Sequence, residues 1–296
     1  AIGASKAYVY LRAEYPLAIA RLTEAIAQAK QVGLVGHDIL GCGFDLDIVI
    51  KMGAGAFVCG EETALIHSIE GKRGMPRPRP PFPAVRGLFD RPTIINNVET
   101  LASLPSIIQN GAEWFRQWIH ERSAGFRLYS LSGHVNRPGV YEAPMTITLR
   151  DLIEQFGGGF DGEPQAVLIG GAAGGFVHPS NLDVPLTHED LRALNAPIGS
   201  GAVMVFNQSV DLWQVVEDLA HFFVHETCGH CAPCRLGTKQ IHATLGKINQ
   251  GDGSTADLNR LETLGQTIRR TCACGLGMTA ANPLLTFLRH FEPNLR

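Results

Sequence analysis

The 296-residue sequence lacks the features of several protein classes. It has no apolar run near the roughly 18 residues that cross a bilayer, which excludes a direct membrane span. It has no cationic excess, because 25 Lys and Arg face 28 Asp and Glu, and this excludes a large basic surface for nucleic acid. The start, AIGASKAYVY, lacks both Met and a secretory signal. We therefore expect a cytoplasmic chain that is a fragment of a longer protein.

Cysteine is also used in a pattern that excludes a secreted disulfide scaffold. The seven cysteines are an odd number, and five of them lie between positions 228 and 274. A disulfide scaffold would be short and would spread its cysteines along the whole chain. The clustering favours metal binding in a reducing compartment, and we interpret the isolated Cys42 and Cys59 as structural thiols.

The first part of the chain, residues 1–125, has the pattern of an α/β domain. A strand is expected over residues 8–11, then a helix that begins at Pro16 and ends at Gly33. Period-two alternation predicts a half-buried strand over residues 45–52, and a glycine-rich turn leads to a short helix closed by Gly71. A proline-rich stretch at 76–84 is predicted to be extended, and a long helix over 97–119 to be interrupted at Pro105.

Two further parts follow. Residues 126–207 predict two short strands, a helix capped by Thr148 and ended by Gly157, and two more strands, which make a compact α+β module. Residues 208–296 predict amphipathic helices that pack as a small bundle. A chain of this length is long enough for three such units, each with its own core.

The strongest motif is ETCGHCAPC, which places Cys228, Cys231 and Cys234 three residues apart. Three thiolates at this spacing can converge on one face of a four-iron cluster, whose fourth iron then needs a distant ligand. RRTCACGLG supplies a candidate in either Cys272 or Cys274, and spacing alone does not decide between them. A zinc site more often uses two separated Cys-x-x-Cys pairs, so iron–sulfur is the favoured interpretation.

The glycine-rich turn GAGAFVCGEE is a weaker signal. Its third glycine comes two residues late for the dinucleotide fingerprint, and a tight strand-to-helix turn would explain it. Glu61 and Glu62 open a helix, where acidic residues complement the helix dipole. Arg79 lies between prolines and has two interpretations, a solvated loop or a rigid contact to an anionic ligand.

Three stretches together are similar to a known family: residues 53–84, residues 92–104 and the cysteine motif at 226–237. They resemble the NADH-binding, FMN-carrying subunit of respiratory complex I and the diaphorase subunits of soluble NAD-linked hydrogenases and formate dehydrogenases. The resemblance runs along essentially the whole chain and covers the C-terminal two thirds of the family's usual length. It implies an α/β flavin domain, a β-grasp-like module, and a four-helix bundle that carries a 4Fe-4S cluster.

The resemblance also implies site residues. Gly60, Glu61 and Glu62 would line the flavin and nicotinamide site, with Glu62 facing NADH. Phe57 stands where Tyr is frequent and Arg79 where Lys is frequent. Phe82 would stack near the adenine. Asn96, Asn97 and Thr100 match FMN contacts. The CGLG sequence aligns Cys274 with the fourth cluster ligand and leaves Cys272 spare.

The expected function is NADH-linked electron transfer, in which a hydride passes from NADH to FMN and single electrons pass on to the cluster and to partner subunits. A 2Fe-2S ferredoxin-like subunit is an expected partner. We expect an NADH dehydrogenase or diaphorase type of enzyme subunit in which no side chain acts as a general acid or base. The alternative is a non-catalytic electron-transfer or docking subunit with a working cluster and an incomplete flavin site.

A first prediction concerns flavin in a polypeptide of residues 1–296 alone. In the family, the glycine-rich loop around the FMN phosphate lies upstream of the position that corresponds to Ala1. Losing several charge-assisted hydrogen bonds of about 1.5–3 kcal/mol each should weaken FMN binding by orders of magnitude. The polypeptide should purify with iron and without flavin, and adding the upstream segment should restore flavin. Stoichiometric FMN in its absorption spectrum would contradict this expectation.

Overall fold

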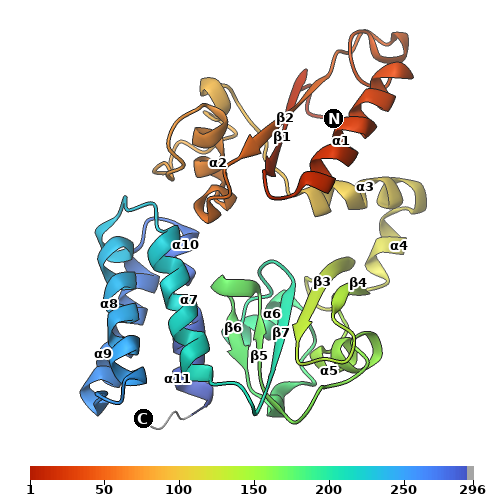
Figure 1. Cartoon of the computed structure of the whole chain (residues 1–296). Helices are drawn as coiled ribbons and strands as arrows, with labels where there is room; N and C mark the ends of the chain where they lie inside the picture. Colours follow the sequence, from red (N-terminus) through yellow and green to blue (C-terminus); the bar gives the residue numbers. More distant parts are fainter. Residues whose placement is uncertain (292–296) are drawn as a thin grey trace. The chain divides into compact units, whose positions relative to one another are not determined.

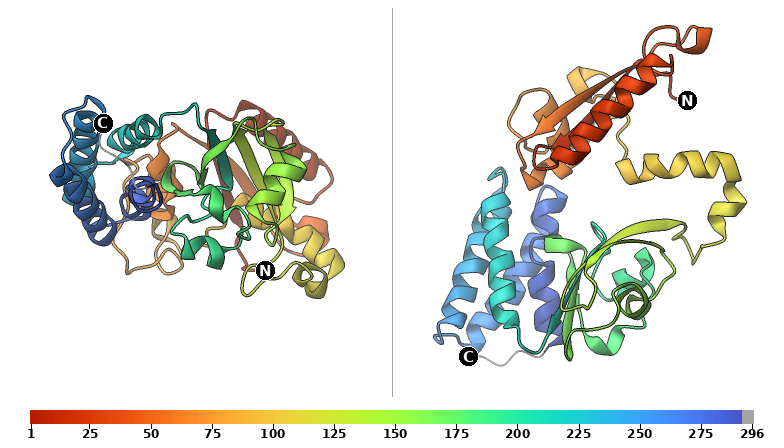
Figure 2. Two further views of the ribbon diagram at one scale, coloured as in Figure 1. Left: turned by 90° about the horizontal axis from the view of Figure 1, so that it is seen from below. Right: turned by 45° about the vertical axis from the view of Figure 1, so that its right-hand side comes forward.

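The computed structural model describes residues 1–291 and shows a mixed α/β protein (Figures 1 and 2). The chain forms two compact units, Ala1–Ile95 and Asn96–Arg296. The second unit therefore includes the helical stretch that the sequence assigned to the first domain, and the predicted boundaries at 125 and 207 stay a prediction. In the described part of the chain, no helix combines the length and the apolar character that a membrane crossing requires.

The first unit is a β-α-β arrangement followed by a short helix. It contains β1 (Lys6–Arg12), α1 (Pro16–Gln31), β2 (Asp47–Gly53) and α2 (Glu62–Ile69). Strands β1 and β2 pair in parallel, from Lys6 opposite Asp47 to Arg12 opposite Gly53. A parallel pair needs a crossover, and α1 provides it. The predicted strands, the helix start at Pro16 and the helix end before Gly33 are confirmed.

The proline-rich stretch after α2 is held by buried charges. The side chain of Glu70 is only 4% exposed and accepts hydrogen bonds from Lys72 Nζ and Arg77 Nη2, both at 2.8 Å, and from the Phe89 amide at 2.9 Å. Arg77 Nε also donates to His67 Nε2 at 2.8 Å. This network fixes residues 72–89 against the C-terminal end of α2.

The second unit contains a five-stranded mixed sheet. Its strands are β3 (Phe126–Gly133), β4 (Gly139–Pro144), β5 (Pro164–Ile169), β6 (Gly175–Val177) and β7 (Ala202–Asn207), in the order β4-β3-β7-β5-β6. β3 and β7 are parallel, and the other pairs are antiparallel. One face packs on α5 (Leu149–Asp151), a π-helical turn (Leu152–Phe156) and α6 (His188–Ala193) through buried Tyr129, Leu152, Val167, Leu191 and Val205.

Five helices follow the sheet: α7 (Leu212–Glu226), α8 (Ala232–Asn249), α9 (Thr255–Thr271), α10 (Gly275–Thr279) and α11 (Asn282–His290). Neighbours pack in the order α7 to α8, α8 to α9, α9 to α11 and α11 to α7 (Figure 1). Helix α11 also contacts β6, where the Phe176 amide donates to Thr286 Oγ1 at 2.9 Å. Sheet and helices therefore belong to one unit.

Two expectations about local structure are wrong. Pro105 lies inside α3 (Val98–Asn110), and the break comes at Gly111, whose φ of +87° ends α3 before α4 (Ala112–Arg116). A single proline removes one helical hydrogen bond, whereas the left-handed backbone of Gly111 turns the chain out of the helix. Cys42, expected to be packed, is exposed, while Cys59 is buried as predicted.

The Glu70 network gives a stability prediction. Glu70→Gln should lower the free energy of unfolding by about 3 kcal/mol, because it leaves the half-buried Arg77 without its carboxylate. Burial opposes ionisation of Glu70, but the bonds from Lys72, Arg77 and the Phe89 amide hold its pKa below the ordinary value. The stabilisation is thus present above the unfolded-state pKa and is lost as pH falls.

The measurement is urea unfolding of the variant and of a matched control. Glu24→Gln removes the exposed pair with Arg21, whose side chains are 57% and 74% exposed, and should cost less than about 1 kcal/mol. Equal losses in the two variants would show that the Glu70 network does not stabilise the unit.

Candidate functional site

Three cysteines lie on the loop that joins α7 to α8. Thr227 is the C-cap of α7, and Cys231 is the N-cap of α8. Gly229 has φ +76°, a left-handed conformation that suits glycine, and its carbonyl accepts from Arg235 Nη1 at 2.7 Å. The loop is therefore anchored at both ends, by a helix cap and by an arginine of the following helix.

Two more cysteines lie at the junction between α9 and α10. Cys272 is the C-cap of α9, Cys274 is the N-cap of α10, and both are buried. Gly277 closes the space between this junction and α8. A Cβ at Gly277 would lie 2.6 Å from Cys272 Sγ and 3.2 Å from Cys234 Cβ. The tertiary fold thus brings together two cysteine segments about forty residues apart in the sequence.

The buried thiols affect one another. Burial raises the pKa of Cys234, Cys272 and Cys274, and the charges of neighbouring cysteine thiols raise each of them further. The Thr227 hydroxyl lowers the pKa of Cys234, and the amides of Gly277 and Leu276 lower that of Cys274. Among the described residues, no donor acts to lower the pKa of Cys272, which is held well above the ordinary value.

The thiols fit a multi-iron cluster better than a single ion. Within residues 1–291, no three or more His, Cys, Asp or Glu side chains are placed to hold one metal ion. Zinc at about 2.3 Å from each sulfur needs sulfurs within about 4 Å of one another. A four-iron cluster puts irons and sulfides between its thiolates and needs a wider arrangement. The donors that meet Cys234 and Cys274 also suit ionised thiolates.

The glycine-rich turn of the first unit leads into α2, and Glu61 caps this helix. Its carboxylate accepts from the amides of Thr63 and Ala64, both at 2.9 Å, and from Thr63 Oγ1 at 2.5 Å. The carboxylate is thereby used in capping. Cys59 packs behind the turn, since a Cβ at Gly74 would lie 2.6 Å from its sulfur.

Glu62 and Arg79 form an ion pair on the surface of the same unit. Arg79 Nη1 lies 2.6 Å from Glu62 Oε1, and the side chains are 40% and 37% exposed. Phe82, three residues after Arg79, is 56% exposed. Gly60 is exposed and Phe57 is half-buried. A charged pair, an exposed aromatic ring and a bare glycine backbone therefore lie on one short stretch of chain, where they are accessible to a ligand.

The remaining predicted flavin residues belong to the second unit. Asn97 is the N-cap of α3, and its side-chain oxygen accepts from the Glu99 amide at 2.8 Å. Asn96 and Thr100 are exposed. The sequence-predicted residues are thus divided between the units, and the structure describes each set within its own unit.

Comparisons with known proteins identify the family. Three family models match: the Nuo51 FMN-binding domain at residues 1–106, the SLBB domain at 128–177, and the NADH-ubiquinone oxidoreductase-F iron-sulfur binding region at 214–296. A second F-type subunit of the NADH-quinone oxidoreductase of Rhizobium meliloti is 46% identical over 99% of this chain and 70% of its own length. The chain belongs to the F-subunit family of NADH-quinone oxidoreductases.

Other members of the F-subunit family extend this result. The NADP-reducing hydrogenase subunit HndC of Solidesulfovibrio fructosivorans is 47% identical over 100% of this chain, and the NADH-quinone oxidoreductase F subunit of Mycobacterium tuberculosis is 45% identical over 99%. The chain spans 61% and 66% of their lengths. A crystal structure of a NAD+-reducing NiFe hydrogenase in the H2-reduced state matches with TM-score 0.88 and 38% identity, over 98% of this chain and 48% of that one.

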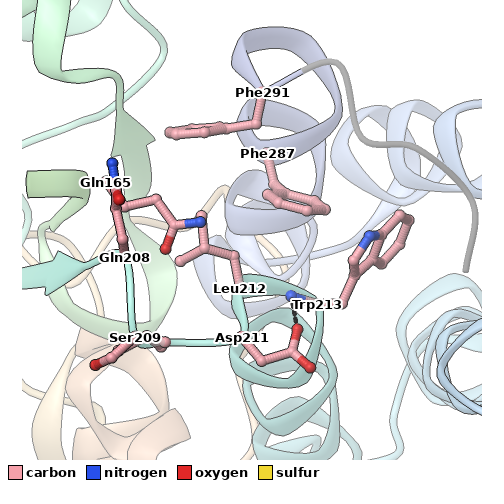
Figure 3. Close-up of a pocket in the computed structure, with 9 residues that line it drawn as sticks. Gln165, Gln208, Ser209, Asp211, Leu212, Trp213, Phe287 and Phe291 are labelled. Atoms are coloured by element: carbon pink, nitrogen blue, oxygen red, sulfur yellow. Dashed lines mark hydrogen bonds between the residues drawn. The ribbon is translucent and has the colours of Figure 1, made fainter.

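This member of the F-subunit family also has a pocket away from the cysteines (Figure 3). Its volume is about 490 Å³, and its walls include Trp213, Phe287 and Phe291. Asp211, which caps α7 by accepting from the Trp213 amide at 3.0 Å, lies at its floor. The pocket is at the N-terminal end of α7, and Cys228 follows the C-terminal end, about 22 Å along a helix of 15 residues.

Sequence reasoning missed two residues beside the thiols. Thr227 Oγ1 lies 3.1 Å from Cys234 Sγ, and Gly277 makes room for Cys272. A signal for Thr227 is its place directly before the first cysteine, since Thr and Ser often bond to nearby groups at helix ends. A signal for Gly277 is the second glycine of CGLG, because a helical glycine frequently permits close packing.

Proposed function

We propose that this chain carries electrons from NADH, through FMN, to a 4Fe-4S cluster and on to partner subunits. The observation that carries the proposal is the convergence of Cys228, Cys231 and Cys234 with the α9–α10 junction. Family membership and the match to an FMN-binding domain support the flavin half of the reaction. The alternative, an electron-transfer or docking subunit without flavin, rests on the cysteines alone.

The proposed cluster ligands are Cys228, Cys231, Cys234 and Cys274. Two backbone amides, those of Leu276 and Gly277, donate to Cys274, and its position at the start of α10 favours a thiolate through the helix dipole. Cys272 follows the end of α9, where the dipole is unfavourable to a negative charge. These contacts support Cys274 as the fourth ligand and Cys272 as a buried neutral thiol.

The proposed nucleotide site uses Phe57, Gly60, Glu61, Glu62, Arg79 and Phe82 in the first unit and Asn96, Asn97 and Thr100 in the second. When bound, FMN and the cluster supply the change from hydride to single-electron transfer. Arg79 offers a guanidinium to a nucleotide phosphate, which would compete with Glu62 for it. Glu62 would then be released to face the nicotinamide, while Glu61 holds the start of α2. Gly60 permits close approach of a ring.

The proposed architecture is an α/β flavin domain, a β-grasp-like module and a four-helix bundle around the cluster. The contacts of α7, α8, α9 and α11 support the bundle. We further propose that the partners are other redox subunits of a cytoplasmic complex, including a 2Fe-2S ferredoxin-like subunit. Its relatives are named as subunits of quinone oxidoreductases and of a hydrogenase.

Cofactor counts test the proposal as a whole. After anaerobic purification of the full-length protein, iron and acid-labile sulfide should each be close to four per chain, with one FMN. Zinc in their place would overturn the cluster assignment. A complete cluster without FMN, in the full-length protein, would favour the electron-transfer or docking subunit.

The fourth ligand is tested by a pair of serine variants. Cys274→Ser should abolish the EPR signal of the reduced 4Fe-4S cluster, whereas Cys272→Ser should retain it, because only Cys274 has donors that stabilise a thiolate. Each variant is the other's control, since both replace a buried thiol within two residues. The reverse outcome would assign the ligand to Cys272.

Glu62 is tested by kinetics in the full-length protein. Glu62→Gln should change the KM for NADH or the rate of flavin reduction, while iron content and EPR signal stay constant. The lost surface ion pair should cost about 1 kcal/mol or less in stability. Asp90→Asn is the control, because it removes the exposed pair of Asp90 with Arg86, 2.7 Å apart in the same unit. Kinetics that match the control would leave Glu62 only a helix-start role.

A further inference from the structure

We propose that Thr227 sets the reduction potential of the cluster by donating a hydrogen bond from its hydroxyl to the thiolate of Cys234. Thr227 Oγ1 and Cys234 Sγ are 3.1 Å apart, within hydrogen-bonding distance for sulfur. Thr227 itself binds no iron in this scheme. The inference rests on the proposed cluster and assigns a positioning residue to it.

The direction of the hydrogen bond follows from the chemistry of the two groups. A cysteine bound to iron is a thiolate and has no proton to donate. The Thr227 hydroxyl has one proton and two lone pairs, and the Gly229 amide donates to its oxygen at 3.3 Å. That contact occupies a lone pair and leaves the hydroxyl proton available for Cys234.

The hydroxyl is held in place by the helix end. The Thr227 amide donates to the Phe223 carbonyl at 3.1 Å, and Phe223 is 1% exposed in the helix core. Threonine is β-branched, so few χ1 rotamers are open to it. Cys234 is 4% exposed, and a hydrogen bond to a charged sulfur is stronger in such a poorly solvated place than in water.

Reduction adds one electron to the cluster and makes its sulfurs more negative. A donor aimed at a ligand sulfur therefore stabilises the reduced form more than the oxidised form and raises the potential. Hydrogen bonds to the sulfurs and solvent exposure are established determinants of iron–sulfur potentials. Thr227 would thus make the cluster a better electron acceptor from the flavin.

The test is an EPR-monitored redox titration of the full-length protein and its variants. Thr227→Val is nearly isosteric but lacks the hydroxyl, so the cluster midpoint potential should become more negative. Thr227→Ser retains the hydroxyl and should stay close to the parent value. Thr238→Val is the matched control, because the Thr238 hydroxyl donates to the backbone oxygen of Cys234, at 2.8 Å, and does not bond to its sulfur. Its potential should be unchanged.

Two results would overturn the inference. One is a Thr227→Val protein with about four irons and four sulfides per chain and an unchanged potential. The other is loss of the cluster in both Thr227→Val and Thr227→Ala while Thr227→Ser keeps it, which would make Thr227 a loop anchor. If only Thr227→Val loses the cluster, the potential of Thr227→Ala decides. Absence of a cluster in the parent protein would instead overturn the proposed function.

Discussion

Close approach of the helices that carry the cysteines is the constraint on which the site depends. A Cβ at Gly237 of α8 would lie 2.4 Å from Ile268 Cδ1 of α9, and one at Gly277 would lie 2.6 Å from Cys272 Sγ. Glycine at both positions lets the α7–α8 loop meet the α9–α10 junction. Larger residues would force one of the packed elements to shift, and the thiols would separate.

Capping groups organise both halves of the candidate site. Cys231 and Cys274 begin α8 and α10, so the start of a helix favours negative charge near each sulfur. Glu61 caps α2 with its own carboxylate in the first unit. The same physical effect therefore prepares thiolate ligands in one unit and fixes a glycine-rich turn in the other. Glu62, one residue later, has no cap to make and is left for the ion pair with Arg79.

Buried and exposed charges have different roles in the first unit. Glu70 is nearly inaccessible and is satisfied by three donors, which suits a structural role. The Glu62–Arg79 pair is more than a third exposed on both sides, so its net contribution to stability is small. A weak exposed pair can exchange a partner for a ligand at low free-energy cost, whereas a buried network cannot. This contrast is why the nucleotide proposal rests on Glu62 and Arg79.

The sequence by itself determined the elements and the chemistry of the ligands. Period-two alternation indicated β2, Pro16 and Gly33 bounded α1, and Cys-x-x-Cys-x-x-Cys indicated an iron–sulfur motif, because these signals depend on neighbouring residues alone. Tertiary structure decided the rest. Cys272 and Cys274 are equally near in sequence, and only the fold shows amide donors at Cys274 and a close contact with Gly277 at Cys272. Donors and close contacts come from residues distant in the chain or from helix ends, and local patterns do not encode them.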